Sequence, residues 1–150
     1  MEILPASFTE KDLERFFSQL TRMDKSTSVE GKKFMLRRIL ESSNSGLLER
    51  WLLWTFHADF FLPFGFPDVS DFMARPSEGV GLVMSWRVFA RIMDDLQSGR
   101  LTGSPLEKAL VSFLENVPER VLDWYIRLLQ HRLSEGIDQS VVRHLAPGLL

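Results

Sequence analysis

Apolar residues in this 150-residue chain recur every three or four positions, and no stretch alternates apolar and polar residues as a half-buried strand would. Leu13, Phe16, Phe17 and Leu20 form one such stripe, at the spacing that gives an amphipathic helix a single apolar face. Similar stripes follow, separated by glycine, proline and short polar segments. The pattern predicts an all-α fold of about seven or eight helices, in one domain over residues 1–150.

Helix-start signals place the predicted boundaries. Ser7 with Glu10 and Thr27 with Glu30 resemble capping boxes, and Ser104 is followed by proline and acidic residues that suit a first helical turn. The predicted helices begin near residues 7, 27, 45, 77, 104, 118 and 138, with a further short turn at 69–73.

Three of the predicted helices carry further expectations. The helix over residues 45–59 contains His57 and Asp59, which we expect to point to different sides, and the helix from 118 is predicted to run to Gly136. In the helix over residues 77–98, we expect an inward-facing apolar stripe. Its members are Val80, Val83, Met84, Val88, Ile92 and Leu96.

Composition restricts the class of protein. The chain has no cysteine, which excludes disulfides and thiolate metal sites. No apolar run reaches the roughly 18 residues of a membrane span, and the N-terminus lacks the basic start and long apolar core of a signal peptide. We therefore expect a cytoplasmic protein without a membrane partner.

The formal net charge of −2 is unusual for a nucleic-acid-binding domain, because contacts to phosphates dominate such binding. Basic residues nevertheless concentrate in residues 32–50 and 120–150. This distribution is compatible with basic patches on one face and predicts weak binding of nucleic acid.

The last part of the chain carries a series of spaced motifs. Residues 100–103 are RLTG, Arg127 follows one predicted helix later, and Leu133 precedes Gly136 by three residues. Ser140 and the terminal Pro147-Gly148-Leu149 complete the series. This segment resembles the end of the N-terminal DNA-binding domain of ATP-dependent DNA ligases, closest to the T-even bacteriophage type.

The resemblance implies a domain that grips nicked duplex DNA in replication and repair. In such ligases a nucleotidyltransferase domain follows, whose K-x-D-G lysine takes AMP. None of the lysines here begins K-x-D-G, so we expect no enzymatic activity and no cofactor in this chain. ATP and Mg²⁺ would belong to the catalytic domains of the parent ligase, which would be partners of this domain.

On this resemblance, the DNA contacts lie in residues 125–144, which are predicted to form a helix, a glycine turn and a second helix. Contacts to the backbone across the minor groove require shape and charge rather than base identity. Without the resemblance, the same charges would indicate only a solvated face. The residues concerned are Arg127, His131, Arg132, Gly136, Ser140, Arg143 and His144.

Two further groups leave their alternatives open. The polar turn at 100–103 is either a phosphate contact or only a helix connection, and a basic face at 32–37 is either a second backbone contact or a solvated surface. The residues are Arg100, Thr102 and Gly103 in the turn, and Lys32, Lys33 and Arg37 on the helix face.

Aromatic residues are predicted to fill the core rather than to stack on bases. This applies to the four tryptophans and to the loop that contains Phe60, Phe61, Phe64 and Phe66. Neither a metal-ligand motif nor a catalytic motif occurs in the sequence. Two hypotheses from different classes remain: a ligase DNA-binding domain, and a complete small protein that keeps the ligase fold and binds a protein partner.

Overall fold

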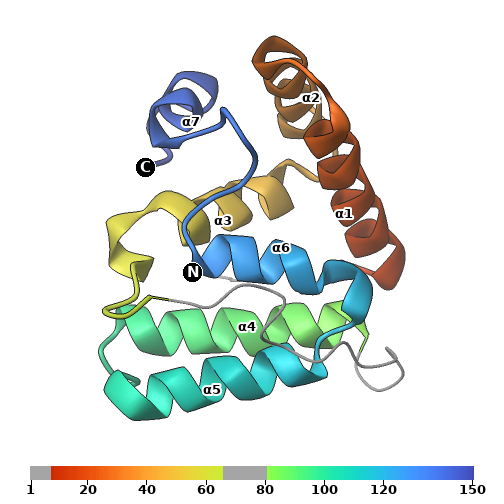
Figure 1. Cartoon of the computed structure of the whole chain (residues 1–150). Helices are drawn as coiled ribbons and strands as arrows, with labels where there is room; N and C mark the ends of the chain where they lie inside the picture. Colours follow the sequence, from red (N-terminus) through yellow and green to blue (C-terminus); the bar gives the residue numbers. More distant parts are fainter. Residues whose placement is uncertain (1–7, 66–80) are drawn as a thin grey trace.

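The structure, a computed structural model, describes residues 8–65 and 81–150. Over these residues it consists of α-helices with one short 3-10 helix (η1) and no sheet, which confirms the all-α prediction. The elements shown in Figure 1 are α1 (Glu10–Lys25), α2 (Val29–Leu40), α3 (Ser45–Phe56), η1 (Ala58–Phe60), α4 (Leu82–Gln97), α5 (Gly103–Asn116), α6 (Glu119–Leu129) and α7 (Gln139–Leu145).

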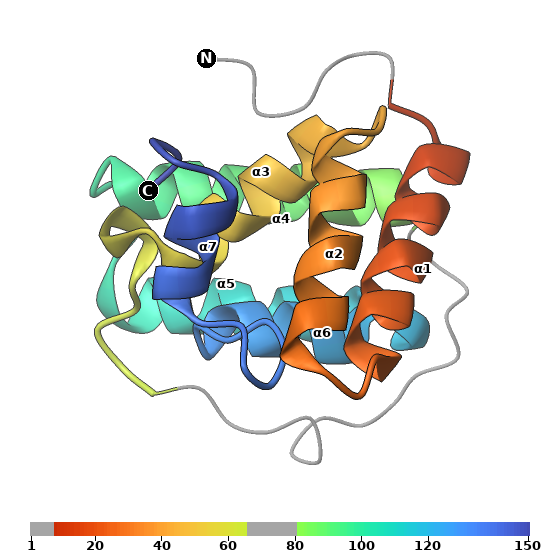
Figure 2. The ribbon, with the colours of Figure 1, turned by 90° about the horizontal axis from the view of Figure 1, so that it is seen from above.

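The helices form two pairs with further helices between them. Helices α1 and α2 pack together on one side, and α4 and α5 lie side by side along the lower edge of Figure 1. Helices α3 and α6 run between these pairs and carry much of the core. Helix α7 packs beside α2 on the face seen in Figure 2, so the two most basic predicted segments meet there.

An aromatic cluster forms the centre of the core. Trp51 of α3 is fully buried, with its ring centroid 5.4 Å from that of Phe17, 5.9 Å from that of Trp86 and 5.0 Å from that of Tyr125. Most of these rings meet edge to face, the arrangement their quadrupoles favour. All four tryptophans are buried, including Trp54 and Trp86, for which the sequence leaves partial exposure open.

The first two helix starts lie slightly beyond their predicted positions. Thr9 caps α1 in a capping box: its Oγ1 accepts a hydrogen bond from the Asp12 N–H at 3.2 Å, and Asp12 Oδ2 accepts one from the Thr9 N–H at 3.0 Å. The predicted Ser7 cap lies outside the described residues. Ser28, rather than Thr27, caps α2. The polar segment after Leu20 remains helical as far as Lys25.

The later starts show larger differences. The predicted start of α4 at Ser77 lies outside the described residues. At Leu82 and Val83 the backbone N–H groups of α4 donate to the carboxylate of Glu10 on α1, at 3.0 and 2.8 Å, so a distant side chain caps this helix. Helix α5 begins at Gly103, with Thr102 at the N-cap position. The predicted cap at Ser104 would have started the helix two residues later.

The exposed face of α4 differs from the prediction. Met84 and Val88, expected to point inward, are 54% and 41% exposed. The core side of α4 instead carries Trp86 and Phe89, and both of these are fully buried. The apolar stripe of α4 is therefore wider than the face that packs on the core, and Met84 and Val88 lie on the part that faces outward.

Candidate nucleic-acid interface

Helix α6 ends at Leu129, seven residues before the predicted end at Gly136. The N–H of Arg132 donates to the carbonyl of Arg127 at 3.0 Å, and the N–H of His131 donates to the carbonyl of Leu128 at 2.9 Å. This pair of bonds is a Schellman motif, which satisfies carbonyls at a helix end. It requires a left-handed residue, and here His131 with φ of 61° takes the position that glycine usually occupies.

Side-chain contacts hold His131 in this conformation. Its Nδ1 lies 3.2 Å from the carbonyl oxygen of Thr55, its Nε2 accepts a hydrogen bond of 3.4 Å from the Leu62 N–H, and its ring centroid is 4.5 Å from that of Phe61. These contacts fit the neutral ring with its proton on Nδ1. Burial lowers the pKa of His131, and the hydrogen bond to Thr55 only partly offsets this. The prediction that His131 faces a phosphate is therefore not supported by its position.

Arg127 is the centre of a polar network that joins three parts of the chain. Its Nη1 lies 3.0 Å from Oδ1 of Asp24 on α1, and its Nε lies 2.9 Å from Oδ2 of Asp123 one turn earlier. Nη1 also donates to the carbonyl of Leu133 at 3.1 Å, and the guanidinium carbon lies 4.7 Å from the centroid of the Trp124 ring. The guanidinium is thus used inside the fold, whereas the sequence predicts that it contacts DNA.

The charges of this network stabilise one another. Burial of the Asp24 carboxyl opposes its ionisation, but hydrogen bonds from Arg127 and Ser134 outweigh that effect and lower its pKa. Ser134 Oγ donates to Asp24 Oδ1 at 2.6 Å. Burial alone would lower the pKa of Arg127, but Asp24 and Asp123 outweigh it and raise the pKa. Neither Asp24 nor Ser134 is marked by a sequence motif, because their partners lie about a hundred residues away in the chain.

Helix α2 contacts the same turn, which we call the 130–137 turn after its residues. Lys32 is only 7% exposed, and its Nζ donates to the carbonyl of Glu135 at 2.9 Å. Gly136 has a φ of 83°, and a Cβ built on it would lie 2.5 Å from Cγ2 of Val29. The prediction that Lys32 lies on an exposed basic face is therefore wrong, and Gly136 serves the packing of the turn against α2.

Helix α7 begins at its own cap rather than at an open phosphate site. The carboxylate of Asp138 accepts hydrogen bonds from the Val141 N–H at 3.0 Å and from Ser140 Oγ at 2.7 Å. Those two bonds lower the pKa of Asp138. Ser140 therefore serves the cap, and an anionic side chain already occupies the start of this seven-residue helix.

The remaining predicted cations face solvent. Arg132, Arg143 and His144 are exposed on the 130–137 turn and α7, and Arg37 is exposed on α2. Arg132 Nε donates only to the neutral amide of Gln130, at 2.8 Å. We call the three arginines, Arg37, Arg132 and Arg143, the outer cations, and His144 lies beside Arg143 on α7. Lys33 lies on the same helix as Arg37, but its Nζ is 3.3 Å from Oε1 of Glu30.

The turn before α5 is anchored by acidic residues of α4. Arg100 Nη2 lies 3.1 Å from Asp94 Oδ2, and its Nε lies 3.0 Å from Asp95 Oδ1. Thr102 and Gly103 are exposed, and Thr102 makes no side-chain cap hydrogen bond. The two acidic residues make this turn a poor phosphate contact and favour its interpretation as a helix connection.

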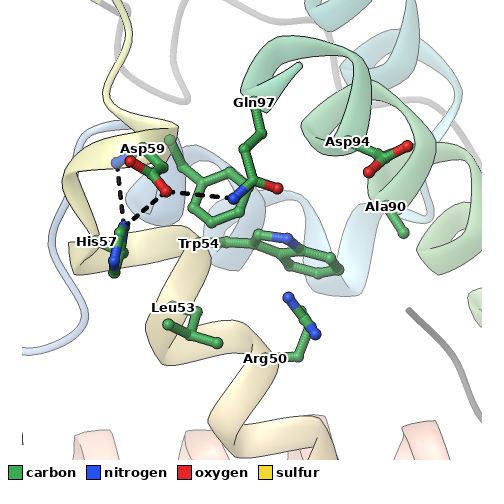
Figure 3. Close-up of a pocket in the computed structure, with 9 residues that line it drawn as sticks. Arg50, Leu53, Trp54, His57, Asp59, Ala90, Asp94 and Gln97 are labelled. Atoms are coloured by element: carbon green, nitrogen blue, oxygen red, sulfur yellow. Dashed lines mark hydrogen bonds and ion pairs between the residues drawn. The ribbon is translucent and has the colours of Figure 1, made fainter. Parts of the chain in front are cut away.

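A separate polar pocket of about 240 Å³ lies between α3, η1 and α4 (Figure 3). His57 Nδ1 is 3.7 Å from Oδ2 of Asp59, and Gln97 Nε2 donates to the same carboxylate at 3.2 Å. The prediction that His57 and Asp59 diverge is wrong, because α3 ends at Phe56 and the 3-10 turn brings them together. No serine, threonine or cysteine is among the described lining residues.

The aromatic loop lies next to this pocket and is only partly core. Phe60 is buried and Phe64 packs partly buried against the core, whereas Phe61 is exposed on its outer side and lies against His131. Phe66 lies outside the described residues. The loop therefore supports the 130–137 turn as well as the core.

Protein-family models, curated proteins and solved structures were compared with the chain, and none of the three comparisons found a match. Across residues 8–65 and 81–150, no group of histidine and acidic side chains has the arrangement of a metal site. Within those same residues, no helix combines the length and apolarity needed to cross a bilayer.

Proposed function

We propose that this chain binds duplex DNA through its phosphate backbone, as the DNA-binding domain of an ATP-dependent DNA ligase. The proposal is supported by the motifs of residues 100–149 and by the way the basic residues divide in the structure. Arg127, His131 and Lys32 are used inside the fold to fix the 130–137 turn. The outer cations lie on this turn and on α2 and α7 beside it.

The division of the basic residues between internal contacts and the exposed surface is the observation that carries the proposal. A backbone that is ordered before binding loses less conformational entropy when it meets a ligand, so a few contacts suffice. Helices α2 and α7 lie side by side, and the outer cations belong to these helices and to the turn between α6 and α7 (Figure 2). Such a surface meets phosphates on either side of a groove and does not identify bases.

Affinity at physiological salt should be low, because the net charge is −2 and the outer cations are few. If about three phosphates are neutralised, the logarithm of the binding constant should fall with the logarithm of the salt concentration with a slope near −3. Fluorescence anisotropy of a labelled nicked duplex at several salt concentrations measures this slope.

A matched pair of variants tests the location. Replacing Arg132 and Arg143 together by alanine should reduce the slope by about two and weaken binding to all sequences alike. Arg87→Ala removes an exposed arginine from α4, away from α2 and α7, and should leave the slope unchanged. If wild-type protein shows no salt-dependent binding even at low salt, the DNA proposal fails.

The same proposal predicts that this chain does not form an adenylate adduct, because no lysine in it begins K-x-D-G. Incubation with labelled ATP and Mg²⁺, followed by a denaturing gel, should give no labelled band. A stable label on any lysine would show that the chain combines DNA gripping with the first chemical step.

A further inference from the structure

An apolar groove of about 410 Å³ runs along the outer side of the α4–α5 pair. Met84 and Val88, the two large α4 side chains that are exposed against expectation, form one wall. Ala109, Phe113 and Val117 of α5 contribute the floor and the opposite wall. Helices α4 and α5, which line the groove, lie across the molecule from α2 and α7 (Figure 1).

A buried polar atom lies in the wall of this groove. Ser85 is 2% exposed, and its hydroxyl has no hydrogen-bond partner in the described part of the chain. An unpaired buried hydroxyl destabilises a protein unless a partner reaches it. Ser85 lines the groove, but its hydroxyl oxygen is enclosed by the protein and is not open to a bound molecule.

Two arginines flank the apolar wall. Arg87 and Arg91 are exposed and one helical turn apart, in the rows next to Met84 and Val88. Neither arginine is paired with a carboxylate among the described residues, in contrast to Arg100 and Arg127. On the α5 side, the groove is bordered by the neutral polar residues Ser112 and Asn116.

We propose that this groove binds an amphipathic α-helix of a protein partner, with acidic residues beside its apolar face. The apolar side chains would cover Met84 and Val88, and the carboxylates would face Arg87 and Arg91. From Met84 to Ile92 the groove spans about 12 Å, at a rise of about 1.5 Å per residue, which matches two turns of the incoming helix. Its apolar anchors would then stand at positions i, i+4 and i+7.

The interaction is distinct from DNA binding. Because the groove and the outer cations lie on different sides, the partner helix and a duplex can be bound together. A contact of two helical turns is small compared with stable protein interfaces, so the complex should be transient, with a Kd on the order of 10–100 µM.

The test uses a fluorescein-labelled peptide with leucine at i, i+4 and i+7 and glutamate at the flanking positions. Two matched peptides serve as controls: one with lysine in place of each glutamate, and one with the acidic sequence scrambled. Wild-type protein should bind the acidic amphipathic peptide at least tenfold more tightly than either control. Equal binding of the scrambled peptide, or no binding of the acidic peptide up to millimolar protein, overturns the proposal.

Charge reversal provides the decisive variant. Arg87→Glu with Arg91→Glu should weaken binding of the acidic peptide at least tenfold and make the lysine peptide the preferred ligand. Val88→Asp should abolish binding of both peptides, and because Arg87, Arg91 and Val88 are exposed, circular dichroism should be unchanged. Failure of the charge reversal to exchange the preference overturns the proposal.

Light scattering and DNA binding distinguish the remaining outcomes. Wild-type protein should be monomeric, and a dimer that Val88→Asp dissociates would show that a second copy occupies the groove, which overturns the proposal. Nicked-duplex affinity of the charge-reversed variant should stay within about twofold of wild type, since its charges lie outside the outer cations. A larger loss would assign the α4 arginines to DNA instead of to a partner helix.

Discussion

The aromatic cluster around Trp51 and the polar network around Arg127 both fix α6, but through different forces. Trp51 meets Tyr125 of α6 through buried rings, which any apolar residue of suitable size could replace in part. Arg127 lies on the same helix and is held by carboxylates and a carbonyl at distances of 2.9 to 3.1 Å. The first contact secures the position of the helix, and the second secures the turn that follows it.

The two regions should contribute differently to the free energy of unfolding. The aromatic cluster should dominate the free energy of unfolding, because buried apolar area is its main source. The network should add less stability, and its contacts hold the 130–137 turn in place. Variants in the two regions should therefore differ in the size of their effect on stability.

The largest effect is expected in the aromatic cluster. Trp51→Ala removes a fully buried ring that contacts Phe17, Trp86 and Tyr125. We expect a loss of about 3–5 kcal/mol, from lost burial together with the cavity that remains. Chemical denaturation measures this loss. Phe34→Ala, at a side chain that is 57% exposed, is the control and should change stability little.

A smaller effect is expected in the network. Asp24→Ala leaves Arg127 with Asp123 as its carboxylate partner and leaves Ser134 Oγ without its acceptor. Because these groups are partly exposed, we expect a loss of about 1–3 kcal/mol rather than the full cost of a buried unpaired charge. A double-mutant cycle with Arg127→Met should give a coupling energy well above zero, and additive losses would show that the ion pair contributes nothing.

Gly136→Ala tests the close approach of the 130–137 turn to α2. The new Cβ would lie 2.5 Å from Val29 Cγ2 at a left-handed backbone position, so we expect a loss of about 1–2 kcal/mol. Gly46→Ala is the matched control, because a Cβ there meets no atom within 4 Å. Thermal unfolding should show a lower midpoint for the first variant and an unchanged or higher midpoint for the second.

The smallest expected effect is the pH dependence of stability that His131 contributes. Burial lowers the pKa of His131 in the folded protein, so the unfolded chain binds the proton more readily. Stability is therefore fully present above the unfolded pKa of about 6.5 and declines as the pH falls below it. His131→Asn, which tolerates the left-handed backbone, should remove this decline between about pH 7.5 and 5.5. Asp24 adds a separate loss only below about pH 4, since its pKa is lowered.

The sequence predicts regular features better than turns. The stripe from Leu13 to Leu20 and the Asp138 cap are local patterns, and both are present in the structure. The end of α6 could not be predicted, because a histidine, rather than a glycine, takes the left-handed position there and is held by Thr55 and Leu62. Such support depends on tertiary contacts that no local pattern contains.

The same reason explains the errors at the candidate site. A basic residue in a sequence is equally consistent with a phosphate contact and with an internal ion pair. Lys32 donates to a carbonyl of the 130–137 turn and Arg127 is paired with Asp24 of α1, and only the fold reveals those partners. Arg143 and Arg37, in contrast, are exposed as expected.

We propose that the outer cations contact DNA, whereas Arg127 stays inside the fold and holds the 130–137 turn. The most direct test compares the salt dependence of nicked-duplex binding for Arg143→Ala and Arg127→Met, at a temperature where both variants are folded. Arg143→Ala should reduce the slope by about one, because one phosphate contact is lost. Arg127→Met should lower the unfolding midpoint and leave the slope equal to that of wild type, even if its affinity falls. A slope reduced by Arg127→Met and unchanged by Arg143→Ala would contradict the account.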